Sequence, residues 1–184
     1  MENKKVKDVM VPLAEYATVS REATLFEAVM ALENVQKNFE KRRYQHRAVI
    51  VLDEKNNVVG KLSQNDVLRG IEPKYKEIGN VQKISNLALS QEFIQSIMKN
   101  FRLWESSLDN ICRKAGEIKV KDIMYTPEAG EYVDAEASLD AGIHQLVVGY
   151  HQSLLVTHDK KVVGILRLTD VFSEVCEIIK TCKI

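Results

Sequence analysis

The sequence has few of the features that mark a specialised class of protein. Cysteine occurs only three times in 184 residues, at positions 112, 176 and 182, so the cysteines form no even set for a disulfide framework. Positive charge is not in excess either, because 26 Lys and Arg residues balance 26 Asp and Glu residues. A dedicated nucleic-acid binder usually carries a basic excess, so that class is not favoured.

Long hydrophobic runs are also missing. The longest wholly apolar run is Ala48–Leu52, far shorter than the ~20 residues of a membrane-spanning helix. The opening residues Met1–Lys5 are not followed by the apolar core of a secretion signal. Together with the odd number of cysteines, this predicts a cytoplasmic protein with free thiols. With 45% apolar and 28% charged residues, the composition is that of an ordinary globular protein of one or two domains.

What the sequence does contain is an internal repeat. Val6–Met10 (VKDVM) recurs 114 residues later as Val120–Met124 (VKDIM). Val58–Val67 recurs 104 residues later as Val162–Val171. Because both blocks keep their order, the chain is predicted to be a tandem duplication, with ten more residues inside the first copy.

Each copy is predicted to fold in the order β-α-β-β-α. In the first copy Thr24 is a good helix N-cap, and the helix after it is expected to continue into residues 39–43. The apolar Ala48–Leu52 and the valine-rich Val58–Leu62 are predicted strands, and Ser63 begins a second helix. The second copy repeats this pattern, with a helix capped by Ser138, strands at Leu154–Val156 and Val162–Leu166, and a last helix near Thr169–Lys180.

Between the copies, residues 73–118 do not follow the repeat. Apolar residues recur at helical spacing from 93 to 101 after a capping Ser90, and a second helix is expected over about 106–115. This segment is interpreted as a helical linker packed on the repeats. The alternative is a dimer or effector surface that carries the lone Trp104.

The repeated motifs together resemble the CBS domain, a family named for cystathionine beta-synthase whose members occur in tandem as the Bateman module. The resemblance rests on the VKD[VI]M opening, the Ala-Thr/Ser-Leu helix start and the Gly-to-Asp segment after a valine strand, all present twice in order. It implies an α/β (α+β) fold in which two β-α-β-β-α repeats pack as a pseudo-twofold pair. The repeats are expected at residues 1–72 and 119–184, with the helical insert at 73–118.

In this family the clefts between copies bind adenine nucleotides such as AMP, ADP and ATP, and sometimes S-adenosylmethionine. The modules are usually regulatory rather than catalytic, and they commonly pair as homodimers. The resemblance therefore implies a regulatory sensor of an adenine nucleotide, without a catalytic cofactor. The main alternative is a scaffold that has kept the fold without the ligand and acts on a protein effector through the helical insert.

The family's ligand signature is Gly-h-h-[Ser/Thr]-x-x-Asp, in which h is apolar. The first copy has GKLSQND from Gly60, which matches except for Lys61 at an apolar position. The resemblance implies that Asp66 binds the ribose hydroxyls and that Ser63 contacts the phosphate. A helix N-terminus also attracts an anion. The alternative interpretation is that Ser63 and Asp66 only cap the helix.

The second copy has GILRLTD from Gly164, which keeps Asp170 but replaces the hydroxyl residue by Arg167. An arginine at this position would either occlude the cleft or hold a phosphate with its forked guanidinium. Occlusion or weak binding is favoured, because the bulk of the side chain changes the space available whatever the ligand. The sequence therefore predicts one strong nucleotide site per chain, in the first copy.

The adenine is expected to lie against strand residues of each copy. The positions implied by the resemblance are Thr18, Val19, Arg47, Ala48 and Val49 in the first copy and Tyr132, Val133, Ser153 and Leu154 in the second. A basic cluster precedes the strand of the first copy, consisting of Lys41, Arg42, Arg43, His46 and Arg47. Most of these residues are expected to complement a helix C-terminus, with His46 or Arg47 as the better candidate for a phosphate contact.

Other chemistries are less well supported. His144, His151 and His158 are evenly spaced, but the repeat puts them on a helix, at a strand entrance and in a turn, and HExxH and CxxC spacings are missing. Cys176 and Cys182 lie six residues apart, which is not one helix face, and no partnered histidine is evident for a nucleophile. The sequence also contains no Walker or GxGxxG loop. It therefore predicts a binding protein, with neither a metal site nor an enzymatic activity.

Overall fold

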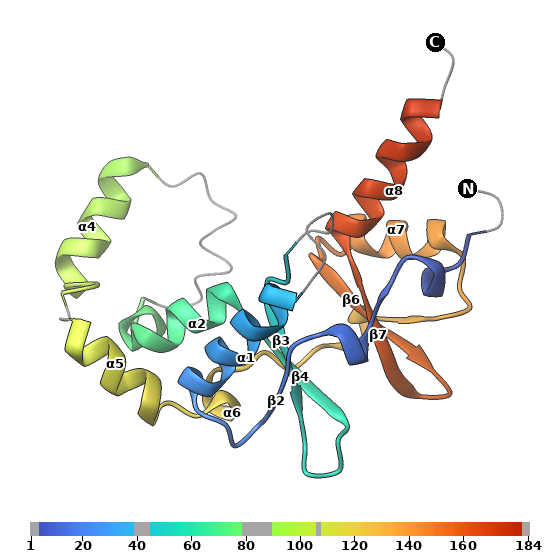
Figure 1. Cartoon of the computed structure of the whole chain (residues 1–184). Coiled ribbons are helices and arrows are strands. Elements are labelled where there is room, and N and C mark those ends of the chain that lie inside the picture. Colours follow the sequence, from blue (N-terminus) through green and yellow to red (C-terminus); the bar gives the residue numbers. More distant parts are fainter. Residues whose placement is uncertain (1–3, 39–44, 79–89, 106–107, 182–184) are drawn as a thin grey trace.

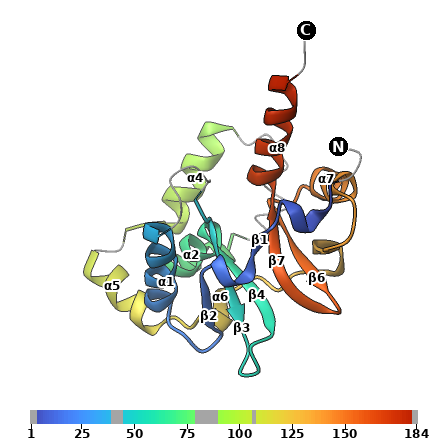
Figure 2. The same cartoon turned by 45° about the vertical axis from the view of Figure 1, so that its right-hand side comes forward.

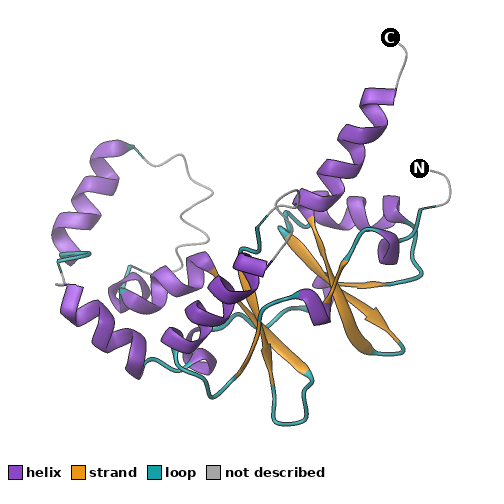
Figure 3. Cartoon of the chain, in the orientation of Figure 1, coloured by secondary structure: helices purple, strands orange, loops and turns teal. Residues whose placement is uncertain are grey.

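The structure, a computed structural model of the whole chain, describes residues 4–38, 45–78, 90–105 and 108–181. In these residues the strands form two sheets with helices beside each (Figures 1 and 3). One sheet has the strand order β2-β3-β4 and the other the order β1-β7-β6-β5. No helix among the described residues is long and apolar enough to cross a membrane. The predicted tandem of two mixed α/β repeats is confirmed.

The first copy has the predicted order of elements. These are β2 (Thr18–Ser20), α1 (Leu25–Asn38), β3 (Ala48–Leu52), β4 (Val58–Ser63) and α2 (Gln64–Ile71). β3 lies between a parallel β2 and an antiparallel β4. Thr24 caps α1, because its hydroxyl accepts the Glu27 amide at 3.2 Å while the Glu27 carboxylate accepts the Thr24 amide at 2.6 Å. The expected continuation into 39–43 lies outside the described residues.

The second copy repeats this arrangement. Its elements are β5 (Tyr132–Asp134), α7 (Leu139–Val148), β6 (Ser153–His158), β7 (Lys161–Arg167) and α8 (Leu168–Thr181). β6 lies between a parallel β5 and an antiparallel β7, so both sheets have the same internal pairing. Ser138 occupies the N-cap of α7 as predicted, but its side chain makes no capping hydrogen bond to a described residue. The far end of α8 extends away from the sheets (Figure 2).

The opening segment of the first copy packs on the second copy. It consists of a short 3-10 helix, η1 (Val6–Asp8), and the strand β1 (Val11–Pro12). β1 runs antiparallel to β7. The Val6 amide donates to the Ala137 carbonyl at 3.0 Å, and the Leu139 amide donates back to the Lys4 carbonyl at 2.9 Å. The segment is therefore part of the opposite copy's fold, an exchange that the sequence repeat did not predict.

The opening segment of the second copy makes the equivalent contacts with the first copy. It contains α6 (Val120–Ile123), and the Val120 amide donates to the Ala23 carbonyl at 2.9 Å. Tyr125 and Lys61 exchange both backbone hydrogen bonds at 2.9 Å, which adds a strand-like residue to the edge of β4. The exchange is therefore reciprocal.

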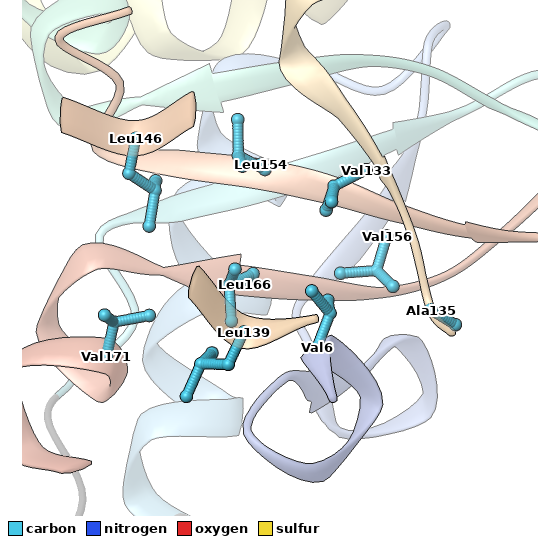
Figure 4. Packing of buried hydrophobic residues seen from close by; sticks show 9 residues of the cluster. All are labelled: Val6, Val133, Ala135, Leu139, Leu146, Leu154, Val156, Leu166 and Val171. Atoms are coloured by element: carbon cyan, nitrogen blue, oxygen red, sulfur yellow. The ribbon is translucent and has the colours of Figure 1, made fainter. Parts of the chain in front are cut away.

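Val6 and Val120 each complete the hydrophobic core of the opposite copy. Val6 is fully buried among residues of the second copy, and Figure 4 shows its side chain beside Leu139 and Leu166. Val120 is fully buried in the cluster of the first copy, which includes Leu25. Removing either valine side chain would therefore leave a cavity in the hydrophobic core of the opposite copy.

The repeated glycines make this exchange possible. A Cβ atom at Gly164 would lie 2.6 Å from the Met10 sulfur and 2.7 Å from the Val11 carbonyl oxygen. A Cβ atom at Gly60 would lie 2.8 Å from the Met124 sulfur. These distances leave no room for a side chain, so each glycine lets the methionine of the other copy's opening segment lie on the strand. The repeated methionine of the opening motif thus packs on the repeated glycine of the strand motif, in each case across the two copies.

A separate cluster joins the two sheets face to face. It contains Ile50 from β3, Leu155 from β6 and Ile165 from β7, with Val11 and Tyr16 packed among them. Ile50 and Leu155 occupy equivalent positions, since each pairs with the first residue of the parallel strand beside it. Burial of apolar surface, at about 25 cal/mol per Å², holds the copies together as a pseudo-twofold pair.

The insert between the copies contains η3 (Pro73–Lys76), α4 (Gln91–Phe101) and α5 (Leu108–Glu117). Ser90 caps α4 as predicted, because its hydroxyl accepts the Phe93 amide at 3.2 Å. α5 lies beside α1 and α2, and its Lys114 ammonium donates to the Ile71 carbonyl at 2.8 Å. α4 stands apart from both sheets (Figures 1 and 2). Only part of the insert therefore matches the packed linker that was predicted.

The lone tryptophan anchors the turn after α4 to the first copy. The buried Glu72 carboxylate accepts the Trp104 amide at 2.9 Å, and the Trp104 indole donates to the Tyr75 hydroxyl at 2.9 Å. Arg102 and Trp104 both have positive φ angles, of 50° and 59°. The contact holds the tight turn after α4 against the end of the first copy.

Candidate functional site

The first candidate site lies where β4 ends and α2 begins. The Ser63 hydroxyl oxygen accepts the Asp66 amide at 3.3 Å. Oδ2 of Asp66 accepts the Ser63 amide at 2.8 Å and the Ser63 hydroxyl at 2.6 Å. The helix cap is therefore formed, and it uses one carboxylate oxygen. The other oxygen, Oδ1, has no hydrogen-bond partner among the described residues and stays available to an outside donor.

The predicted strand residues of the first copy divide between two faces of the sheet. Thr18 pairs with Ile50 and Ala48 precedes Ile50 by two residues, so both lie on the face that meets the other sheet. Val19 and Val49 lie on the opposite face, in the core under the helices. Only Thr18 and Ala48 are therefore placed near the contact between copies, and Ala48 pairs directly with Ser63 across the β3–β4 ladder.

The second copy divides in the same way. Tyr132 pairs with Leu155, and Ser153 precedes Leu155 by two residues, which puts both on the face toward the first copy. Val133 and Leu154 are buried in the core of the second copy.

Three further polar side chains lie beside the first site. The Lys61 ammonium is paired with the Glu131 carboxylate and lies 5.2 Å from the centre of the Tyr125 ring. The Tyr125 hydroxyl donates to Glu131 Oε1 at 2.5 Å, and the Glu128 amide donates to the same oxygen at 3.2 Å. The Lys61 and Glu131 side chains are only 17% and 4% exposed, so this is a buried ion pair between the copies.

The electrostatics tie this cluster to the signature residues. Burial alone would raise the pKa of Glu131, but hydrogen bonds from Lys61 and Tyr125 outweigh it and hold that pKa below its usual value. The hydrogen bond to Glu131 and the burial of the phenol raise the pKa of Tyr125 to about 12, and the negative charge of Asp66 adds to the effect. Asp66 is therefore close enough to act on the cluster.

The second candidate site, at the start of α8, is built differently. The Arg167 guanidinium grips the Asp170 carboxylate with both ends of its fork, Nε to Oδ2 at 2.5 Å and Nη2 to Oδ1 at 2.6 Å. The side chains are 5% and 13% exposed. Both carboxylate oxygens are thus occupied by the protein's own arginine, in contrast to the single engaged oxygen of Asp66.

Two side chains of the first copy lie near the second site. The Tyr16 and His46 rings meet edge to face at a centroid distance of 4.2 Å, and both residues are buried. Burial, with the positive charge of Arg167, lowers the pKa of His46 to about 4, while the charge of Asp170 opposes this. Burial also raises the pKa of Tyr16 to about 12. His46 is therefore neutral near pH 7 and offers hydrogen bonds rather than charge.

The buried His46 predicts a stability that depends on pH. Folded His46 takes up a proton only near pH 4, whereas an unfolded histidine does so below about pH 6.5. The unfolded chain therefore binds more protons between these values, and the free energy of unfolding should fall by about 2 kcal/mol from about pH 7 to about pH 5. Urea unfolding of the wild type and of His46→Gln at both pH values measures how much His46 contributes to this pH dependence. An equal pH dependence in the two proteins would contradict it.

Both copies of the repeat match a known protein family. A family model described as CBS domain matches residues 6–73 and residues 120–177, which together make up most of the chain. The chain belongs to the CBS domain family. The two matched segments are the two copies of the repeat, so the chain is a tandem CBS pair with a helical insert.

Solved structures of other CBS proteins share the fold. CBSX2 from Arabidopsis thaliana has a TM-score of 0.61 and 19% identity, over 98% of this chain and 99% of that chain. A CBS domain-containing protein from Kribbella flavida has a TM-score of 0.60 and 16% identity, over 98% of this chain and 100% of that chain. CBSX2 in complex with AMP has a TM-score of 0.57 and 20% identity, over 95% and 98%. A comparison with curated proteins found no match.

The basic cluster expected near the first site of this CBS pair is only partly described. Lys41, Arg42 and Arg43 lie outside the described residues. Arg47 is exposed at the start of β3, and its carbonyl accepts the Gln64 amide at 3.2 Å, which places its backbone beside the N-terminus of α2. Arg47 is therefore near the first site, whereas His46 packs at the second.

Among the described residues, no group of three or more His, Cys, Asp or Glu side chains could hold a metal ion. Cys112 and Cys176 are free thiols, and Cys182 lies outside the described residues.

Three residues at the two sites went unnoticed in the sequence. Tyr125, Glu131 and Tyr16 match no CBS signature, and each reaches its site from the opposite copy. One signal was available for Glu131: a lysine at an apolar signature position needs a buried partner, which predicts a carboxylate nearby.

Proposed function

We propose that this CBS pair is a regulatory module that binds one adenine nucleotide per chain, at the first site. Oδ1 of Asp66, which accepts no hydrogen bond from the described residues, can accept the hydroxyl groups of a ribose while Oδ2 keeps the helix cap. The N-terminus of α2 presents amide groups and a positive dipole end toward a phosphate. The observation that carries the proposal is this half-engaged carboxylate beside a helix N-terminus.

The contrast with the second site supports a single nucleotide. Asp170 gives both oxygens to Arg167, so a ribose could bind only after a bidentate ion pair had opened. Tyr16 and His46 are also buried near that pair, close enough for the charges of Arg167 and Asp170 to act on them. The AMP complex of CBSX2 supports adenine nucleotides as the ligand class, since that protein has the same fold.

The regulation would be conformational. The first site combines residues of both copies, because Tyr125 and Glu131 come from the second copy and Ser63 from the first. A ligand that touches both copies favours the arrangement it binds best, and its differential affinity sets the size of the shift. The role is that of a binding module, without a catalytic step.

Substitution of Asp66 tests the proposed site. Asp66→Ala is expected to weaken binding of AMP by about 1–3 kcal/mol, the usual loss for a charge-assisted hydrogen bond. Calorimetric titration with AMP measures this. The matched control is Asp8→Ala, which also removes a capping carboxylate, one that accepts the Lys5 amide at 2.8 Å on the opening segment. Unchanged affinity in Asp66→Ala would place the ligand elsewhere.

The same proposal includes a homodimer. Large apolar side chains stay exposed on the helices of both copies, namely Phe26 and Val29 on α1, Leu68 on α2 and Phe172 on α8. Leu68 and Phe172 occupy equivalent positions in the two copies, as expected for a symmetric surface. Light scattering should give twice the chain mass of 20.9 kDa, and a mass of 20.9 kDa at micromolar concentration would contradict the dimer.

A second candidate function is a scaffold without a ligand. It is favoured by α4, which leaves Phe93, Ile94 and Met98 exposed on a helix that stands apart from the sheets. The two functions differ in one measurement. A nucleotide sensor is stabilised by AMP, ADP or ATP in a thermal-shift experiment, because the ligand binds the folded state, whereas a ligand-free scaffold is not.

A further inference from the structure

Lys61 replaces an apolar residue on a buried face. Its equivalent in the second copy is Ile165, which is buried in the cluster between the sheets. A lysine on this face loses most of its hydration, and it is retained only if its charge is compensated. The two copies therefore differ in the side chain at this position. Lys61 lies in the first copy, where only one oxygen of Asp66 accepts hydrogen bonds from the described residues.

The partner of Lys61 does not depend on Lys61 alone. Glu131 accepts the Tyr125 hydroxyl at 2.5 Å and the Glu128 amide at 3.2 Å, both on Oε1. The Lys61 ammonium is on the other oxygen, Oε2. If Lys61 moved away, the Glu131 carboxylate would keep two hydrogen-bond donors. Moving the Lys61 ammonium to another anion therefore costs less free energy than breaking an isolated ion pair.

Lys61 is also within reach of the N-terminus of α2. Lys61 and Ser63 are two residues apart on one strand, so their side chains project from the same face about 7 Å apart. The four-carbon stem of a lysine is flexible enough to cover such a distance while its backbone stays in the sheet. The backbone itself is held on both sides, by Ile50 in β3 and by Tyr125.

The carboxylates at the first site favour a cation that can move to the phosphate of a ligand. Asp66 and Glu131 are both negative, and Lys61 balances only one of them. A nucleotide adds a further one or two negative charges with each phosphate, which would be repelled by the carboxylates. We propose that Lys61 leaves Glu131 to bind the phosphate of the nucleotide, and that the Lys61–Glu131 pair thereby sets the preference of the first site for phosphorylated ligands. This rests on the proposed function.

The movement of Lys61 also couples ligand binding at the first site to the second copy. Glu131 ends η4 (Ala129–Glu131) and directly precedes β5, so the ion pair is a contact between the copies. Transfer of Lys61 to a ligand removes that contact and adds one within the first site. The ligand is sensed as a change in how strongly the copies hold each other.

Calorimetric titration of the full chain with AMP and with adenosine tests the proposal. Lys61→Met keeps the apolar stem and removes the charge, and it should weaken AMP binding by about 10- to 100-fold relative to adenosine binding. Glu131→Gln keeps the shape and frees Lys61, and it should tighten AMP binding by about 3- to 10-fold relative to adenosine binding. The two halves of one ion pair thus act in opposite directions.

A purely structural ion pair would behave differently. Both variants would then weaken AMP and adenosine together, and that result overturns the proposal while leaving the nucleotide site intact. The double variant Lys61→Met with Glu131→Gln is the control for folding, because it buries no lone charge, and it should match Lys61→Met in its AMP-to-adenosine ratio. A wild-type chain that binds neither ligand would refute the proposed function itself and this inference with it.

Discussion

A chain without its first ten residues is expected to lose the cooperative unfolding of its second copy. Those residues bring the buried Val6 side chain into the core of the second copy and pair backbone groups with Ala137 and Leu139. Loss of a buried aliphatic side chain and of several backbone hydrogen bonds should cost at least about 4 kcal/mol. Urea unfolding followed by circular dichroism measures the change.

A point substitution separates this effect from a general effect of truncation. Val6→Ala should lower the free energy of unfolding by about 2–3 kcal/mol, because two buried methyl groups are lost and a cavity remains. Val148→Ala is the matched control, since Val148 is exposed on α7, and it should change stability by less than about 0.5 kcal/mol. Equal effects of the two substitutions would show that the opening segment does not belong to the second core.

Arg167→Ala is expected to destabilise the protein by about 3–5 kcal/mol. The substitution leaves Asp170 in a largely buried place without the guanidinium that engages both of its oxygens. Denaturant unfolding near neutral pH measures the loss.

The double variant Arg167→Ala with Asp170→Ala identifies the cause. It removes the unpaired charge, so part of the lost stability should return relative to Arg167→Ala. Lys180→Ala is the control for an exposed pair, since Lys180 and Glu177 are both 68% exposed, and it should change stability by less than about 1 kcal/mol. If the double variant is no more stable than Arg167→Ala, the loss comes from packing rather than from charge.

The repeat was enough to predict the elements but not how they assemble. The period of the apolar residues and the capping residues Thr24, Ser63 and Ser90 are local signals, and they predicted the helices and strands closely. The exchange of the opening segments is not local. Val6 repeats as Val120 whether each packs on its own copy or on the other, so the sequence contains no information that separates the two arrangements.

The candidate sites were also predictable only in part. The signature placed Ser63 and Asp66 at a helix N-terminus, where they lie in the structure. The replacement by Arg167 predicted unequal nucleotide binding by the two copies, which stays a prediction; the bidentate Arg167–Asp170 pair supports it. The residues that complete each site come from the opposite copy. Glu131 and Tyr16 are therefore recognisable only once the two sheets are placed against each other.

The number of nucleotides bound per chain tests the central claim most directly. Calorimetric titration of the wild type with AMP should reach saturation at one molecule per chain, with Asp66→Ala weakening the binding and Asp170→Ala leaving it unchanged. This follows from the Asp66 oxygen that no described residue engages and from the fully engaged carboxylate of Asp170. Two equal sites per chain would contradict the account, as would an Asp170→Ala variant that loses as much affinity as Asp66→Ala.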